Sequence, residues 1–501
     1  MKPFSIGLSL LGALLLFSCT PKTRVNGSWD LCPVPRSVVE NGESYVVRKA
    51  FPAGIKTCID PALGQELEAF QQAECYRLEV GAKGITLTAA TEVGLIRGMQ
   101  TLEKALPASL GADVIAVLPG ATVFDYPEFP YRAFLLDCGR HFFPVETIRK
   151  VLDILALHQI NEFHWHLSED QGWRLEIKKY PRLTQVGSVR AGDPVPGQKG
   201  HNGVPHSGFY TQEEAREVVV YAAALGIEVI PEIDLPGHMK AALASYPELG
   251  CTGGPYEVAC EWGVLDDVLC AGKEHTLEFV KDVLAEVMDI FPSRYIHLGG
   301  DECPKVRWEA CPACQAKIKE LGLKADGKKT AEELLQSWFM DQASAFVEAR
   351  GRRSIVWNDV LVDWSNDVVG APSKNTVIAG WMRPVSTEIA VREGYDAIFC
   401  PVGHLYLSAA DGNRLKGEAY FRRVFDAPVP EDVLGVEACL WTERVSEPDS
   451  LLWRMLPRMS AVSELQWNAP ASRDYSSFLP RVKRMQALYT ARNWEWNPAA
   501  E

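Results

Sequence analysis

Short apolar runs alternate with amphipathic, helix-like segments through most of the chain. Continuous apolar runs of this length are typical of strands buried on both faces of a parallel sheet. We predict eight such strands, at residues 133–137, 162–167, 228–233, 294–298, 354–357, 376–381, 397–401 and 435–441. Helical periodicity predicts helices at residues 146–157, 212–225, 275–290, 332–349, 451–466 and 477–492. Eight alternating units predict an α/β protein built on a (β/α)8 TIM barrel with enlarged loops.

A different pattern precedes this array. Residues 28–126 combine short strands at 45–47, 76–80 and 85–89 with a helix at 93–106, which predicts a small α/β accessory domain. The proline-containing stretch DYPEFP, residues 125–130, marks the boundary. We therefore place an N-terminal domain at 28–126 and the catalytic barrel, with its C-terminal helices, at 127–501.

The first residues form a third pattern. Lys2 is followed by an apolar run over residues 6–17 and by Leu-Phe-Ser-Cys, ending at Cys19. The run is shorter than the ~20 residues that span a bilayer. It predicts a cleaved lipoprotein signal peptide over residues 1–18, a lipid on Cys19 and a tether over residues 19–27. We expect an exported protein held to a membrane by its lipid, periplasmic or at the cell surface.

Composition narrows the class of protein. The chain has 501 residues, of which 47% are hydrophobic, enough for a large core and more than one domain. Its formal net charge of −14 argues against a nucleic-acid partner, since such proteins carry a basic face. The oligomeric state cannot be read from the sequence.

Functional side chains gather where the predicted strands end, which is where TIM barrels carry their active sites. The fourth strand ends in HLGGDE and presents Asp301 beside Glu302. A partly desolvated carboxyl group has a raised pKa and can act as a general acid near neutral pH. The other ends carry Asp137, Arg140, His141, His164, Trp165, His166, Glu169, Asp170, Asp234, His238, Trp357, Asn358, Asp359, Trp381, Tyr406, Trp441 and Glu443. Several tryptophans beside charged groups favour a sugar site, because pyranose rings pack on aromatic faces.

Several long motifs resemble one family. HLGGDE at 297–302, HWHLSEDQGWRLEIKKYPRLTQVG at 164–187, PEIDLPGH at 231–238, LDCGRHF at 136–142 and LWTE at 440–443 resemble glycoside hydrolase family 20, the β-N-acetylhexosaminidases. GITLTAATEVGLIRGMQTLEKAL at 84–106 resembles the family's accessory domain. The resemblance implies an exo-acting retaining hydrolase of glycans with a terminal β-N-acetylhexosamine. It also implies no cofactor and no metal, and a nucleophile supplied by the substrate's acetamide.

The resemblance implies a role for each residue that matches a position in the family's motifs. Glu302 resembles the general acid/base, Asp301 the acceptor of the acetamido N–H, and Tyr406 the hydroxyl that contacts the acetamide oxygen. The sugar-binding matches are Arg140 and Glu443 for hydroxyls, with Trp357, Trp381 and Trp441 as pocket walls. Asp170, His238 and Asp234 resemble a supporting network. Because adjacent strand residues point to different sides, we expect Asp301 and Glu302 to face apart rather than to flank one bond.

One position departs from the family's pattern. An aspartate usually stands two residues after the tyrosine, whereas this chain reads Tyr406-Leu407-Ser408, with Asp411 nearby but out of register. We expect catalysis to survive the change. The preference for GlcNAc, GalNAc or a 6-sulfated sugar stays open.

Two other functions compete with hydrolysis by carboxylates. His164-x-His166 at a strand end is a possible ligand pair for a catalytic metal. A glycan-binding lipoprotein without turnover is the other alternative.

Among the cysteines, Cys303, Cys311 and Cys314 lack a clear fourth ligand, which favours a local disulfide or a structural loop over a zinc site. Cys138, Cys400 and Cys439 lie in apolar strands and are expected to be buried thiols.

Overall fold

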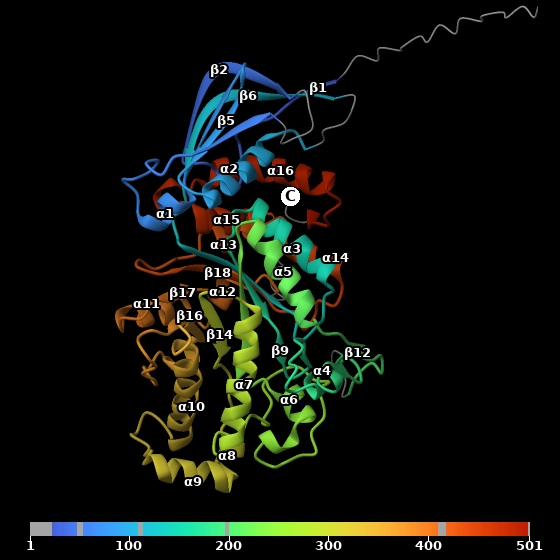
Figure 1. Ribbon diagram of the computed structural model, residues 1–501, viewed down its shortest axis with the longest axis vertical. Helices are drawn as coiled ribbons and strands as arrows, with labels where there is room; N and C mark the ends of the chain where they lie inside the picture. Colours follow the sequence, from blue (N-terminus) through green and yellow to red (C-terminus); the bar gives the residue numbers. More distant parts are fainter. Residues whose placement is uncertain (1–22, 48–53, 109–113, 196–199, 409–416, 499–501) are drawn as a thin grey trace, which may run out of the picture.

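A closed barrel of eight parallel strands forms the larger part of the computed structural model (Figure 1), which describes residues 23–47, 54–108, 114–195, 200–408 and 417–498. Around the barrel the order is β13-β14-β15-β16-β17-β18-β7-β8. The strands are β7 (Tyr131–Asp137), β8 (Glu162–His166), β13 (Glu228–Leu235), β14 (Tyr295–Gly299), β15 (Arg353–Trp357), β16 (Val377–Gly380), β17 (Ala397–Phe399) and β18 (Gly435–Leu440). The predicted TIM barrel, and each of its eight strands, is confirmed.

Both faces of these strands are buried, which explains why their sequences show continuous apolar runs. In β7, Ala133 and Leu135 point into the barrel and join an interior cluster with Ile230 and Ile355. The alternate residue Phe134 faces outward into the larger core beneath the helices. The interior is therefore packed with side chains rather than open.

Amphipathic helices cover the barrel. They include α3 (Val145–Leu157), α5 (Gln212–Ala224), α7 (Glu274–Ile290), α10 (Ala331–Glu348), α11 (Pro384–Arg392), α13 (Glu418–Phe425) and α16 (Tyr475–Ala491). Thr211 and Glu214 form a capping box that begins α5, as their spacing predicts. The single helix predicted at 451–466 is wrong. It is two helices, α14 (Pro448–Met455) and α15 (Arg458–Trp467), because Pro457 has no amide hydrogen to continue the ladder.

The N-terminal domain is a six-stranded sheet with the order β1-β6-β4-β5-β3, in which β2 also pairs with β6. Its elements are β1 (Thr23–Asn26), β2 (Ser37–Val47), β3 (Ile55–Ile59), α1 (Ala69–Glu74), β4 (Tyr76–Gly81), β5 (Gly84–Ala89), α2 (Glu92–Ala105) and β6 (Val114–Asp125). Figure 1 shows α2 beneath this sheet, next to the red C-terminal helix α16, whose Arg484 donates to the Ala105 carbonyl (2.8 Å). The Arg97 guanidinium donates to the Gly226 carbonyl (2.7 Å), just before β13. The domain thus packs against the amino ends of the barrel strands.

Loops with short elements build the opposite, carboxyl end. They contain β9 (Ser168–Glu169), β10 (Gly172–Trp173), α4 (Arg182–Gln185), β11 (Val189–Arg190), β12 (His206–Ser207), α6 (Lys240–Ser245), α8 (Val306–Ala310), α9 (Pro312–Leu321) and α12 (Val402–Leu405). Single 3₁₀ turns lie at Pro247–Leu249, Asn358–Val360 and Pro470–Ser472. Within the described ranges, no helix has the length and apolar character needed to cross a bilayer. The predicted signal peptide and Cys19 lie outside these ranges.

Candidate active site

A pocket of about 500 Å³ opens at the carboxyl end of the barrel. Its lining residues are Arg140, Trp262, Gly263, Asp301, Glu302, Trp381, Val402, Tyr406, Ser408, Trp441, Glu443, Arg444 and Val445. Seven of the predicted site residues, drawn from five different strand ends, therefore meet in one cavity. This convergence is what a TIM-barrel active site requires.

The turn after β14 is built from two glycines. Gly299 and Gly300 have φ values of 66° and 103°, which residues with a side chain rarely adopt. A Cβ on Gly299 would lie 1.7 Å from Asp234 Oδ1, and the Gly300 amide donates to that same oxygen (3.3 Å). Asp234 thus supports the turn that presents Asp301 and Glu302.

Two site residues hold strained backbone conformations. Glu302 and His238 have φ values of 44° and 53°, in the left-handed region that non-glycine residues avoid. Such strain persists where the surrounding structure fixes it, and it concentrates at functional sites. The Glu302 amide donates to Asp359 Oδ1 (3.3 Å), which helps to hold this conformation.

Asp301 and Glu302 face the same side chain, so the expectation that they point apart is wrong. His238 Nε2 lies 3.8 Å from Asp301 Oδ2 and 3.6 Å from Glu302 Oε2. The reason is that β14 ends at Gly299, and the two carboxylates lie in the turn beyond the pleated strand.

Burial and like charges distinguish the two carboxylates. The Asp301 side chain is 14% exposed and that of Glu302 is 36% exposed. Burial above all, with the charges of Asp359 and Glu302, raises the pKa of Asp301 to about 8, and His238 opposes this increase only in part. Burial and the charge of Asp301 also hold the pKa of Asp234 well above its usual range.

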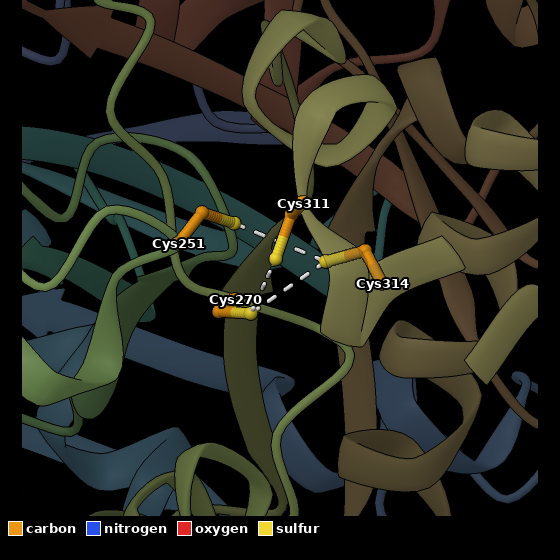
Figure 2. A group of neighbouring side chains, drawn as sticks. All are labelled: Cys251, Cys270, Cys311 and Cys314. Carbon is orange, nitrogen blue, oxygen red and sulfur yellow. Dashed lines mark hydrogen bonds between the residues drawn. The ribbon is translucent and has the colours of Figure 1, made fainter. Parts of the chain in front are cut away.

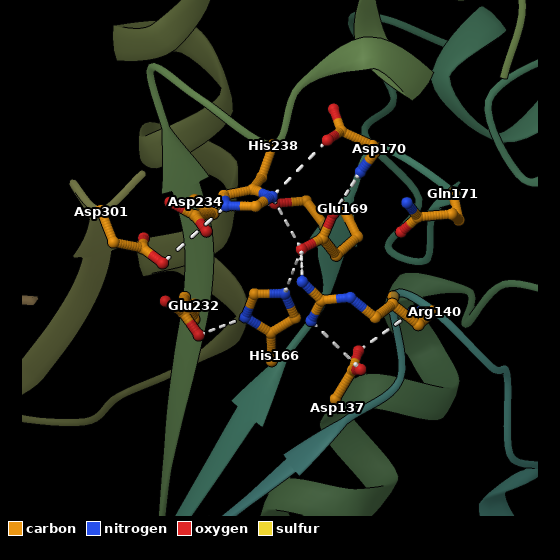
Figure 3. Close-up of polar contacts among 12 residues, drawn as sticks. Asp137, Arg140, His166, Glu169, Asp170, Gln171, Glu232, Asp234, His238 and Asp301 are labelled. Atoms are coloured by element: carbon orange, nitrogen blue, oxygen red, sulfur yellow. Dashed lines mark hydrogen bonds and ion pairs between the residues drawn. The ribbon is translucent and has the colours of Figure 1, made fainter. Parts of the chain in front are cut away.

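His238 is the centre of the predicted supporting network (Figure 3). Its Nδ1 lies 3.0 Å from Glu169 Oε1 and 3.5 Å from Asp170 Oδ2. Burial alone would lower the pKa of His238, but Glu169 above all, with Asp170 and Glu302, holds it well above the usual value. The ring is therefore an imidazolium at neutral pH, and its positive charge faces both Asp301 and Glu302.

Arg140 and Glu443 lie together at one side of the pocket. Arg140 contacts Glu169 (Nη2 to Oε1, 2.5 Å) and Asp137 (Nη1 to Oδ2, 3.4 Å), and its Nε lies 4.0 Å from Glu443 Oε1. Its guanidinium also sits 5.0 Å from the centre of the Trp441 ring. These contacts fix Arg140 in one orientation and leave Glu443, which is more exposed, facing the cavity.

Aromatic rings form the remaining walls. Trp381 and Tyr406 are nearly parallel with centroids 6.4 Å apart, and Trp441 lies 6.0 Å from Tyr406. Burial holds the pKa of Tyr406 well above its usual range, so its hydroxyl stays a donor. Trp357 is 1% exposed and donates to Glu232 (2.9 Å). It packs against Trp441 (6.0 Å) in the layer below the pocket-lining residues.

Three further residues belong to the site although the sequence assigns them no role. Glu169 bridges Arg140 and His238, and these partners, opposing its burial, lower its pKa to about 2. Asp359 accepts from the Trp381 indole (2.7 Å) as well as from the Glu302 amide. Glu169 and Asp359 are already candidates because they follow predicted strands, and the structure supplies their contacts. Trp262 comes from an irregular loop, which no pattern identifies.

The histidines of the alternative metal site lie beneath the pocket. His164 contacts Glu232 (3.1 Å) and Glu437 (3.0 Å), and His166 also pairs with Glu232. These residues are at most 1% exposed, and none is among the pocket's lining residues. A substrate in the pocket could not reach an ion held there, so the cluster is a buried polar support.

Ser408 lines the pocket, as its position after Tyr406 suggests. Its carbonyl accepts from Arg454 (3.1 Å). Asp411 lies outside the described residues. Arg444, which no motif in the sequence identifies, shares the cavity with Ser408.

Comparison with known proteins agrees with this geometry. Residues 129–470 match the family model "Glycosyl hydrolase family 20, catalytic domain", and residues 31–126 match that family's domain 2. Two relatives are named β-hexosaminidase. That of Porphyromonas gingivalis is 40% identical over 430 residues, covering 82% of this chain and 52% of its own. That of Vibrio furnissii is 35% identical over 407 residues, covering 77% and 64%.

A solved structure gives the same result along nearly the whole chain. The crystal structure of β-N-acetylhexosaminidase from Bacteroides fragilis is 30% identical and superposes with a TM-score of 0.78, covering 94% of this chain and 97% of that one. The present chain spans only about half to two thirds of the length of the two relatives above. The resemblance drawn from the motifs is confirmed, and the chain belongs to glycosyl hydrolase family 20.

Proposed function

We propose that the protein is an exo-acting β-N-acetylhexosaminidase that releases terminal, non-reducing β-linked GlcNAc or GalNAc from glycans. The observation that carries the proposal is the pairing of Asp301 with Glu302 in an aromatic-walled pocket, with both carboxylates against His238. The names of the two relatives, and their identity to this chain, support the same activity.

In the proposed mechanism the acetamide oxygen of the substrate attacks the anomeric carbon. The glycosidic C–O bond breaks as Glu302 gives its proton to the leaving oxygen, and an oxazolinium ion forms. Glu302 then takes a proton from water, which attacks the same carbon and opens the ring. Two inversions at one carbon retain the configuration.

Asp301 and Tyr406 would align the acetamide for this attack. An ionised Asp301 accepts the acetamido N–H, and the Tyr406 hydroxyl donates to the oxygen. Burial gives Asp301 a pKa of about 8, so the carboxyl group must release its proton before it can accept the acetamido N–H. The adjacent His238 imidazolium favours that ionised form and offsets part of the effect of burial. The remaining acidic residue lining the described pocket, Glu443, faces Arg140, which fits a hydroxyl-binding role better than that of a nucleophile.

Three p-nitrophenyl glycosides test the activity directly. We expect rapid hydrolysis of the β-GlcNAc and β-GalNAc substrates and almost none of the β-glucoside, because the glucoside lacks the acetamide nucleophile. Equal rates on the glucoside, or a trapped covalent glycosyl-protein adduct, would contradict the mechanism. Binding of GlcNAc without any turnover would favour the glycan-binding alternative.

We further propose that Cys19 carries the lipid that attaches the enzyme to a membrane. Support comes from the apolar run at residues 6–17 and the Leu-Phe-Ser-Cys sequence that follows it. In cells fed a labelled fatty acid, the protein should take up label and sediment with membranes. Cys19→Ser should lose both properties, and retained label in that variant would refute the assignment.

A further inference from the structure

Four cysteines from two separate loops converge on one point (Figure 2). Cys251 and Cys270 belong to the segment between β13 and α7, and Cys311 and Cys314 to the segment between β14 and α10. Their sulfurs lie 3.8 Å (Cys251–Cys314), 3.7 Å (Cys270–Cys311) and 3.5 Å (Cys270–Cys314) apart, and all four lie within 4.8 Å of one another. Cys270 and Cys314 are fully buried.

These distances are those of a metal site rather than of disulfides. A tetrahedral Zn²⁺ with Zn–S bonds of about 2.3 Å separates its sulfurs by about 3.8 Å. A disulfide would need about 2.05 Å and would pair each sulfur with one partner, whereas Cys270 lies nearly as close to Cys311 as to Cys314. We propose that Cys251, Cys270, Cys311 and Cys314 bind one structural Zn²⁺.

The backbone near the four sulfurs allows the two cysteine-bearing loops to come close together. A Cβ on Gly272 would lie 2.2 to 2.3 Å from backbone atoms of Ala313 and Cys314, so only glycine allows the first loop to meet the start of α9. Cys311 caps this ten-residue helix, and Cys314 lies in its first turn. The positive end of the helix dipole favours the thiolate forms that a zinc ion requires.

The sequence alone points to the wrong third cysteine. It groups Cys303 with Cys311 and Cys314 by proximity and shows no fourth ligand. In the structure Cys303 is outside the group, and the second pair, Cys251 and Cys270, comes from a loop some 40 to 60 residues earlier. Cys303, Cys311 and Cys314 are all free thiols in the structure, so the expected local disulfide is not present.

The proposed ion would brace two loops that build the proposed active site. Cys251 and Cys270 bracket an irregular segment that delivers Trp262 to the pocket. The Leu269 amide donates to the Pro236 carbonyl (3.0 Å), two residues before His238, and the Leu269 carbonyl accepts from Trp308 in α8 (2.9 Å). Long loops without secondary structure need such cross-links, because closing them costs entropy.

Metal content of the full-length protein is the first test. After dialysis against metal-free buffer without chelator, elemental analysis should find one zinc per chain. Cys311→Ser should lose that zinc, and the matched control Cys303→Ser should keep it. Iron in place of zinc, or no metal at all in the folded wild type, would overturn the proposal.

Counting thiols in the wild type keeps the test independent of whether a variant folds. Titration with a mercurial should release one zinc as the four cysteines react. Alkylation after denaturation in chelator, without reductant, should label all four in the mass spectrum. Two unlabelled pairs would show disulfides instead and refute the zinc site.

Measurements of Tm and KM test the zinc site separately from the proposed hydrolase activity. Only the KM measurement rests on that proposed function. Cys311→Ser should lower the Tm by several degrees. It should also raise KM, as Trp262→Ala does. The double variant Cys311→Ser/Trp262→Ala should have a KM no higher than that of either single variant, because both changes act through Trp262. If the protein binds zinc but has no hexosaminidase activity, the proposed function is wrong and the zinc site stands. If it is active but binds no zinc, the zinc site is wrong and the proposed function stands.

Discussion

Buried charged groups lie at both ends of the barrel, but their surroundings differ. A buried carboxylate is paired with arginines at the amino end, whereas several carboxyl groups lie close together at the carboxyl end. At the amino end, Glu74 of the N-terminal domain contacts Arg97 (2.7 Å) and Arg132 (2.6 Å). Burial would raise the pKa of Glu74, but the two arginines together hold it below its usual value. Glu74 and its two arginines form an electrostatically satisfied joint between the two domains. The neighbouring Glu162 differs, because burial and Glu228 hold its pKa well above the usual value.

At the carboxyl end, acidic groups crowd together with too little positive charge. Asp234 and Asp301 have raised pKa values because burial and neighbouring carboxylates act in the same direction. His238 offsets this effect only in part. The comparison teaches that the Glu74 joint uses buried charge for stability, whereas the carboxyl end gives up stability to hold several carboxyl groups together at the candidate active site.

The largest expected effect is on activity at the carboxyl end. Glu302→Gln removes the proton donor and should lower kcat/KM on a natural disaccharide by ~10²- to 10⁴-fold. The loss should be smaller on p-nitrophenyl substrates, whose leaving group needs less protonation, and GlcNAc binding should persist. Glu309→Gln, which changes an exposed carboxylate on α8, is the control and should behave as wild type. Wild-type turnover by Glu302→Gln would refute its role.

At the amino end, the expected effect is on stability alone. Glu74→Gln leaves two buried guanidinium groups without their counter-ion and should cost ~3–5 kcal/mol in the free energy of unfolding, measured with urea. The kcat of the folded protein should not change. The control is Glu103→Gln, which breaks the more exposed pair with Arg492 (2.6 Å) and should cost less than about 1 kcal/mol. Equal costs for both variants would contradict the comparison.

The two ends should also respond to pH with opposite sign. The pKa of Asp301 rises from 3.8 to about 8 on folding, so its contribution to stability is fully present below pH 3.8 and is lost as the pH rises through 8. Asp301→Asn cannot ionise and should be more stable than wild type at pH 9, by on the order of 1–3 kcal/mol, although its turnover falls strongly.

Glu74 gives the opposite trend. Its lowered pKa stabilises the fold above pH 4.5, and that contribution is lost as the pH falls through its folded pKa. Urea unfolding of Asp301→Asn and wild type at pH 4 and pH 9 checks the first trend. An unchanged difference between the two pH values would show that Asp301 is not desolvated.

The smallest expected effect concerns sugar preference. Neutral Ser408 and cationic Arg444 line the pocket where the family usually has a carboxylate, so a 6-sulfated GlcNAc glycoside should be accepted. Ser408→Asp should lower kcat/KM for the sulfated substrate relative to the plain one by up to about tenfold, or ~1.4 kcal/mol. Rejection of the sulfated substrate by both proteins, relieved in Asp411→Asn, would mean that Asp411 takes the missing position.

Much of the molecule was determined by the sequence itself. Largely apolar runs identify the barrel strands because each strand is buried on both faces, although β8 (EFHWH) also carries one glutamate and two histidines. Motifs at their ends bring Asp301, Glu302, Tyr406 and Trp441 to one cavity, since the carboxyl ends of parallel strands share one edge. The helical spacing of apolar residues likewise predicts the amphipathic helices that cover the barrel.

Only the tertiary structure decided which residues from distant loops meet. The turn beyond β14 directs Asp301 and Glu302 to one imidazole, against the alternation of a strand. Trp262 reaches the pocket from an irregular segment, and Cys251 and Cys270 join Cys311 and Cys314 across more than forty residues. Local periodicity carries no information on such contacts, because loop conformation depends on packing against segments remote in sequence.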